Sequence, residues 1–120
     1  MWTEIKEMQE YLEIETSEDP SEICERMRVL NVYMARSSRM MAEAKAHRRK
    51  AERDVFAALP DFTTMPANTL KKYLEVSAYE WYEIEDALEN LYKSCVHMID
   101  SMRSLLSYSK EDMRLSRVGN

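Results

Sequence analysis

Residues that interrupt helices are nearly missing from this chain of 120 residues, which contains one glycine, Gly119, and three prolines. Strands are joined by turns, and turns rely on Gly, Pro, Asn and Asp. The sequence is rich instead in Ala, Leu, Met, Glu, Lys and Arg, which favour helices. The composition therefore predicts an all-α protein with few turns and long helices.

Long apolar runs and cysteine motifs are also missing. No apolar run approaches the roughly 20 residues that span a bilayer, and the acidic N-terminus lacks the apolar core of a signal peptide. The two cysteines, Cys24 and Cys95, form no CxxC pair. We expect a soluble, cytoplasmic protein with no membrane partner, in which both thiols stay reduced.

The residue patterns of common enzymes do not occur either. The two histidines, His47 and His97, lie in different predicted helices, and no Glu-x-x-His motif accompanies them. No glycine-rich phosphate loop and no GxSxG motif are present. We expect no catalytic site, no metal site and no cofactor.

Hydrophobic periodicity predicts three helices. Residues 2–15 form a short amphipathic helix, and residues 20–59 form a long basic helix that begins at an Asp-Pro start signal. Pro60 stops this helix, and residues 60–69 form a loop. Residues 70–116 form the last helix, in which Val76-Ser77 is a weak point where a kink is expected.

Both long helices repeat their apolar residues in a 4-3 pattern. Two such helices joined by a short loop pack antiparallel, which predicts one domain built on a coiled-coil-like helical hairpin. Residue numbers that meet across the hairpin then sum to about 128. This register places Trp81 beside His47 and Arg48 beside Glu80.

The last helix carries a second apolar stripe beside the first. The combined face is too wide for one partner helix. We expect the short N-terminal helix to cover part of it and other copies of the chain to cover the rest. The predicted homo-oligomer interface comprises Tyr92, Val96, Ile99, Leu106 and Met113.

Charge is segregated along the chain, although the overall net charge is only −5. Residues 1–25 contain nine acids and one base, whereas residues 26–53 contain nine bases and two acids. A basic block of this kind neutralises phosphates, and nearby aromatic rings give bases a surface on which to stack. The candidate residues for binding single-stranded DNA are Lys45, Arg48, Arg49, Lys50, Arg53, Lys71, Lys72, Tyr79 and Tyr82.

An alternative explanation of the basic block stays open. By the predicted register, Lys45, Arg48 and Arg53 face Glu83, Glu80 and Glu75. They would then be ordinary interhelical pairs of a coiled coil. Because Arg48 falls on the apolar seam, we expect Arg49, Lys50 and Arg53 to be the exposed set.

The layout of the chain resembles the UvsY family of recombination mediators from tailed phages. The similarity is best over residues 88–114, in the runs Leu-Tyr-Lys-Ser-Cys, Met-Ile-Asp-Ser-Met-Arg-Ser and Glu-Asp-Met-Arg. Lys50 and Arg53 match the Lys/Arg-rich DNA-binding segment of that family, with Glu52 between them. The acidic residues 1–25 have no counterpart in the resemblance.

The resemblance implies a small homo-oligomer that binds single-stranded DNA and helps load a recombinase onto strands covered by a single-strand-binding protein. If the chain is phage-derived, it would work in the cytoplasm of a bacterial host. Two other functions stay open: a coiled-coil adaptor that binds a protein through its apolar face, and an inhibitor whose acidic face engages a basic partner.

Overall fold

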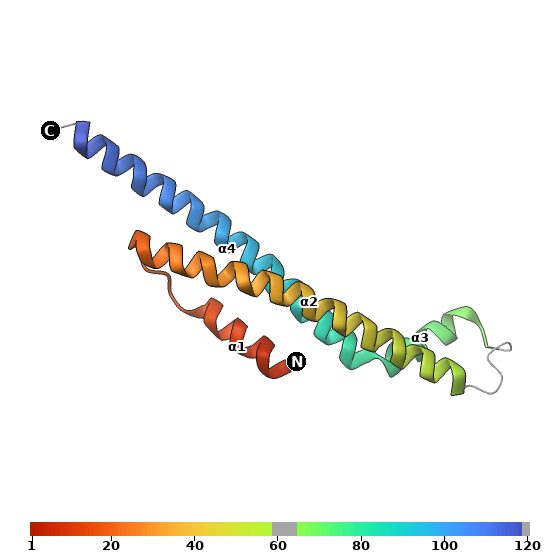
Figure 1. Ribbon diagram of the computed structural model, residues 1–120. Coiled ribbons are helices and arrows are strands. Elements are labelled where there is room, and N and C mark those ends of the chain that lie inside the picture. Colours follow the sequence, from red (N-terminus) through yellow and green to blue (C-terminus); the bar gives the residue numbers. More distant parts are fainter. Residues whose placement is uncertain (59–64, 119–120) are drawn as a thin grey trace.

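The computed structural model describes residues 1–58 and 65–118, and every element in this part of the chain is a helix. The molecule is elongated, with principal extents of 82 × 25 × 18 Å (Figure 1). Its radius of gyration is 21.9 Å, compared with about 14 Å for a compact globule of this length. The all-α prediction is confirmed for the described residues, in the form of a rod.

Two antiparallel helices, α2 (Pro20–Ala58) and α4 (Tyr79–Val118), lie side by side along most of the rod (Figure 1). At the start of α2, the backbone carbonyl of Asp19 accepts the N–H of Ile23, and its carboxylate accepts the hydroxyl of Ser21. Pro20 suits the first position because an N–H there would have no partner within the helix. The predicted end of this helix at residue 59, and its stop at Pro60, lie outside the described residues.

A break divides the single helix that we expected over residues 70–116. The first part, α3, covers Ala67–Ser77, Ala78 caps its C-terminal end, and α4 begins at Tyr79. The hydroxyl of Ser77 donates to the carbonyl of Leu74 at 2.7 Å, a local bond that competes with helix hydrogen bonding. The break therefore falls beside the weak point that the sequence indicates.

The loop that we expected over residues 60–69 is shorter at its C-terminal end. α3 begins at Ala67, where the N–H of Leu70 donates to the carbonyl of Pro66. Proline suits the position before a helix because it has no N–H to donate and its ring clashes with a preceding helical turn. Residues 60–64 of the predicted loop lie outside the described residues.

A third helix, α1 (Trp2–Glu13), packs beside the middle of the hairpin (Figure 1). Its buried side chains, Ile5 and Met8, join a cluster with Met40 of α2 and Ile84 of α4. The short N-terminal helix therefore does cover part of the wide apolar face of α4. Every helix in the described ranges is too short or too polar to span a membrane.

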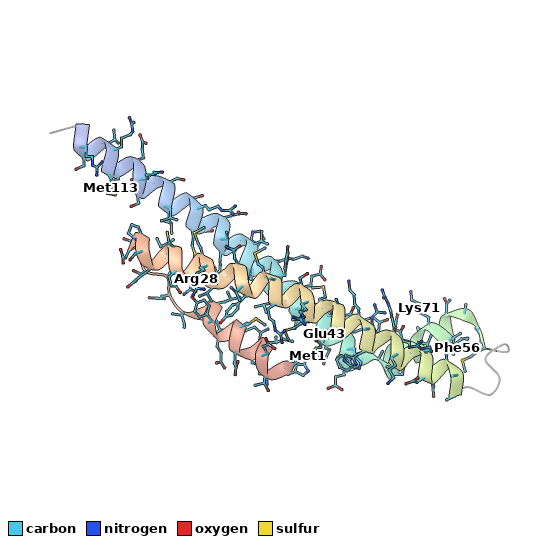
Figure 2. The ribbon with its side chains drawn as sticks, in the orientation of Figure 1. Met1, Arg28, Glu43, Phe56, Lys71 and Met113 are labelled. Carbon is cyan, nitrogen blue, oxygen red and sulfur yellow. The ribbon has the colours of Figure 1, made fainter. Side chains whose placement is uncertain are left out.

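Two apolar clusters form the core and follow one another along the rod. The first is enclosed by three helices, and the second lies mainly between α2 and α4, where Tyr11 and Leu12 of α1 cover it in part. Beyond the second cluster, the last turns of α4 extend past the start of α2 and carry Met113 (Figure 2). The first cluster contains Ile5, Met8, Met40, Ala44, Ile84, Leu88 and Leu91, and the second contains Ile23, Leu30, Cys95, Ile99 and Met102.

Candidate nucleic-acid interface

The basic side chains in the second half of α2 lie mostly in solvent. Lys45, Arg49 and Arg53 are each exposed and follow one another at intervals of four residues, so they share one face of the helix. Lys50 is also exposed and lies about 100° around the helix from Arg49. None of these four side chains forms an ion pair with another described residue. We call Lys45, Arg49 and Arg53 the basic stripe.

The basic stripe faces away from α1. Met40 packs against Ile5 and Met8 of α1, and Arg49 follows it by nine residues, which is about two and a half helical turns. The stripe is therefore on the opposite side of α2 from the acidic N-terminal helix. Its positive charge is not offset by the carboxylates of that helix in the same chain.

Arg48 is committed to contacts within the hairpin. Its Nε donates to Glu85 of α4 at 2.7 Å, and its Nη1 lies 3.5 Å from Glu52. Its guanidinium lies over the ring of Tyr82, whose hydroxyl donates to Glu52 at 2.7 Å. The hydrogen bond to Glu85 raises the pKa of Arg48, so this cation stays charged. Of the nine candidate DNA-binding residues, Arg48 and Tyr82 are half-buried and already partnered.

The partner of Arg48 differs from the predicted one, which was Glu80. Helical side chains lean toward the N-terminus of their own helix. In an antiparallel pair, a long side chain from α2 therefore reaches residues further along α4, and the carboxylate of Glu85 leans back to meet it. The two rings of His47 and Trp81 stack at the predicted level, with centroids 4.5 Å apart, because rings extend less far along the axis.

The junction of α3 and α4 forms an open groove beside this cluster. Its lining includes Lys72, Val76, Tyr79 and Tyr82, so Tyr82 connects the groove to the Arg48 contacts. Tyr79 is 63% exposed, and a hydrogen bond to Glu83 raises the pKa of its hydroxyl. Lys71, also exposed, lies at the same end of the rod as Phe56 (Figure 2). The predicted basic residues of α3 and the predicted aromatic residues at the start of α4 therefore gather at one end of the hairpin.

The predicted oligomer interface does not form one exposed surface. Ile99 is only 4% exposed and belongs to the core of the single chain, beside Ile23 and Leu30. Leu106 packs partly against the same cluster, and Val96 is half-buried. Including Ile99 was wrong because α2 already covers that side of α4. Tyr92 and Met113 remain exposed, on separate parts of α4.

The sequence interpretation missed two features of the molecule. Arg26 is almost fully buried, with Nη2 3.3 Å from the carbonyl oxygens of both Tyr11 and Leu12 at the end of α1. The last turns of α4 expose Tyr108 and Leu115, which the 4-3 pattern did not single out. Counting helical turns past the start of α2 would have identified this uncovered end.

Nothing in the described residues forms a metal-binding group of three or more His, Cys, Asp or Glu side chains. The geometry thus consists of an unpaired basic stripe, a groove with exposed aromatic rings, and an uncovered helix end.

Comparison with known proteins identifies no relative of this chain. No protein-family model matches the chain, and no curated protein and no solved structure matches it either.

Proposed function

We propose that this protein binds single-stranded DNA through the basic stripe and the α3–α4 groove. The observation that carries the proposal is that Lys45, Arg49 and Arg53 share one exposed face and have no acidic partner among the described residues. Among the candidate DNA-binding residues of α2, interhelical pairing accounts for Arg48 alone, so the coiled-coil explanation leaves Lys45, Arg49, Lys50 and Arg53 without a role. Such cations release counterions when they bind phosphates, which favours nucleic acid as the ligand.

The aromatic residues of the groove favour binding of single-stranded over double-stranded DNA. Exposed aromatic rings bind unpaired bases by stacking, largely regardless of sequence. Tyr79 presents such a ring beside Lys72, and its neighbour Tyr73 is exposed as well. Tyr82 does not take this role because it is half-buried and the guanidinium of Arg48 already covers a face of its ring. In this proposal Tyr79 stacks on a base while the stripe and Lys72 neutralise phosphates.

The wider role that we propose is that of a recombination mediator, without catalysis of its own. This part rests on the resemblance to the UvsY family. A homo-oligomer in the bacterial cytoplasm would hold several basic stripes along one strand, and avidity would compensate for the weak binding of each copy. The partners in this role are a recombinase and a single-strand-binding protein.

Binding is tested by titrating a fluorescent oligodeoxythymidine with the protein at two salt concentrations. Affinity should fall steeply with salt, and the logarithmic slope should be about −0.7 per phosphate neutralised. Replacing the three stripe residues, Lys45, Arg49 and Arg53, by alanine should weaken binding and flatten the slope by about two. The matched control replaces Arg28, Lys93 and Arg103, which are exposed but each paired with an acid in its own helix.

The control variant should bind like the wild type, because it loses the same amount of positive charge but keeps the basic stripe intact. Equal binding by the stripe variant and the wild type would reject the stripe as the interface. A wild type that does not bind at low salt would reject the function itself.

A second candidate, the coiled-coil adaptor, is favoured by the uncovered end of α4. Leu115 is 55% exposed near the end of α4, and Tyr108, which is 73% exposed, lines an open pocket with Glu18 and Ile23 beside the start of α2. Exposed apolar side chains of this kind are available for contact with a partner protein. Changing both to serine should abolish the partner contact of an adaptor and leave binding of single-stranded DNA unchanged.

A further inference from the structure

Two surfaces of the molecule carry opposite charges that are not paired within the described chain. One is the basic stripe on α2. The other is the outer side of α1, where Glu7, Glu10 and Glu13 and one lysine, Lys6, are exposed and form no ion pair with any described residue. Acidic residues continue through the segment that leads into α2. Each surface therefore lacks a counterpart in its own chain.

The α1 helix cannot bring its acids to the stripe of its own chain. Arg36 of α2 forms a two-pronged ion pair with Glu4, and Arg26 binds the carbonyl oxygens at the other end of α1. These contacts fix α1 beside the first half of α2, whereas the stripe begins at Lys45 on the opposite side. The unpaired charges can meet only between two copies.

We propose that the outer acidic face of α1 in one copy docks on the basic stripe of the next copy. The net charges are complementary, because three carboxylates outnumber the single Lys6 on α1, whereas the stripe carries only Lys and Arg. The dimensions also agree: Lys45 to Arg53 spans about 12 Å of helix, and Glu7 to Glu13 spans about 9 Å. Complementary surfaces of this kind set the register and speed the encounter of two proteins.

The contact is heterologous, because the two surfaces lie on opposite sides of the hairpin. A copy that gives its α1 to one neighbour still offers its stripe to another. Such head-to-tail contacts generate a ring if the rotation closes and an open chain if it does not. The assembly should therefore grow with protein concentration and should not stop at a two-fold dimer.

The assembly would also regulate the proposed function, and this part alone rests on that function. The stripe is covered by a neighbouring α1 when nucleic acid is absent, and single-stranded DNA competes for it. The acidic N-terminal helix then acts as a displaceable substitute for phosphate. This gives residues 1–25, which have no place in the resemblance, a function in the molecule.

Charge reversal tests the contact without any nucleic acid. One variant carries Glu7→Lys and Glu10→Lys, and a second carries Arg49→Glu and Arg53→Glu. Each alone presents two surfaces of the same sign and should remain a monomer in sedimentation velocity at low salt. An equimolar mixture should associate again, and so should a single chain that carries all four reversals. Circular dichroism of each variant checks that its helix content is unchanged.

A matched control reverses two other exposed acids, Asp86→Lys and Asp112→Lys, and changes the net charge by the same amount. It should associate like the wild type. Association should weaken between about 10 mM and 1 M salt, as the Debye length falls from about 30 Å to about 3 Å. Failure of the mixture to associate, or an assembly insensitive to salt and to both reversals, would overturn the proposal.

The regulatory part is tested with the same variants. The variant Glu7→Lys with Glu10→Lys keeps its stripe but offers no competing α1, so it should bind oligodeoxythymidine more tightly than the wild type at equal salt and at high protein concentration. At nanomolar protein, where copies are dissociated, the difference should shrink to the small effect of the added charge. A difference in affinity that is the same at both protein concentrations would overturn the competition. If the wild type does not bind oligodeoxythymidine at all, the proposed function fails, but the head-to-tail contact is unaffected.

Discussion

The imidazole ring of His47 on α2 stacks almost parallel on the indole of Trp81 on α4, and the angle between the two ring planes is 12°. Replacing His47 by alanine should uncover the indole and cost about 0.5–1.5 kcal/mol of stability. In a Trp2→Phe background, the emission of Trp81 should shift to longer wavelength. His97→Ala is the control, because His97 is exposed and has no ring contact among the described residues. Unchanged emission in His47→Ala would show that the rings do not stack in solution.

Arg26 should hold α1 in place. Its guanidinium lies within hydrogen-bond distance of the carbonyls of Tyr11 and Leu12 in the last turn of α1, where helical partners are lacking, and 5.0 Å from the ring centroid of Tyr11. The Tyr11 carbonyl also accepts the N–H of Ile14. Lysine keeps the charge but lacks the planar fork. Arg26→Lys should therefore cost about 1.5–3 kcal/mol in urea unfolding and should make residues 14–19 more sensitive to proteolysis. Arg28→Lys, at an exposed pair with Glu25, should change neither measurement.

Ser37 weakens the core that it occupies. It is fully buried in α2, and its hydroxyl oxygen has no hydrogen-bond partner in the described part of the chain. Removing an unsatisfied buried polar group recovers its desolvation cost. Ser37→Ala should raise the free energy of unfolding by about 1 kcal/mol. The neighbouring exposed serine gives the control, Ser38→Ala, and a loss of stability in Ser37→Ala would mean that the hydroxyl is bonded after all.

The two thiols should differ in reactivity. Cys24 is exposed, whereas Cys95 is fully buried, and burial raises the pKa of its thiol. Because the thiolate is the reactive form, one thiol per native chain should react quickly with a thiol reagent and the other only on unfolding. The unfolded, non-reduced chain should give two thiols in total. A total of zero would indicate a disulfide and a different arrangement of the helices.

The ion pair of Glu4 and Arg36 should make the docking of α1 sensitive to acid. The hydrogen bond from Arg36 lowers the pKa of Glu4 in the folded protein. Its contribution is therefore fully present above the unfolded value of about 4.3 and is lost as the pH falls through the lower folded value. Both side chains are more than a third exposed, so the effect should stay below about 1 kcal/mol.

The measurement for Glu4 compares urea unfolding of the wild type with that of Glu4→Gln from pH 6 down to acid. The stability difference should shrink as the pH falls below about 4. Glu7→Gln provides the matched comparison, because Glu7 has no ion-pair partner among the described residues. A difference that is constant with pH would contradict the pairing of Glu4 in solution.

The helices and their pairing follow from local features of the sequence, whereas the details of the contacts do not. The absence of breakers and the spacing of apolar residues are enough to predict two long helices. The register alone predicted that Trp81 lies beside His47, and the structure adds that the two rings stack. The partner of Arg48 was not, because the lean of long side chains shifts their contacts by about one turn. Local spacing fixes which residues are level, but it does not fix how far a side chain reaches.

The burial of Ile99 was missed for a related reason. A strict seven-residue repeat drifts by about 20° per heptad on a straight helix, so the boundary between covered and free faces moves along α4. Which of the other residues of α4 are buried depends on where α1 packs. The docking of α1 in turn depends on contacts between residues distant in sequence, such as the one between Arg26 and Tyr11. Within the candidate interface, the exposure of Arg49, Lys50 and Arg53 was predictable, since only Arg48 falls on the seam.

The antiparallel hairpin has a consequence for how the chain folds. Partners near the α3 end are close in sequence: Tyr82 and Glu52 are 30 residues apart, and Arg48 and Glu85 are 37 apart. At the other end, Ile23 and Met102 share a cluster although they are 79 positions apart. Once the nearer pairs have formed, each further pair closes only a few additional residues, so its entropic cost is small. We expect the transition state to be structured around Arg48 and Glu85, with φ-values that decline steadily along the rod toward Ile23.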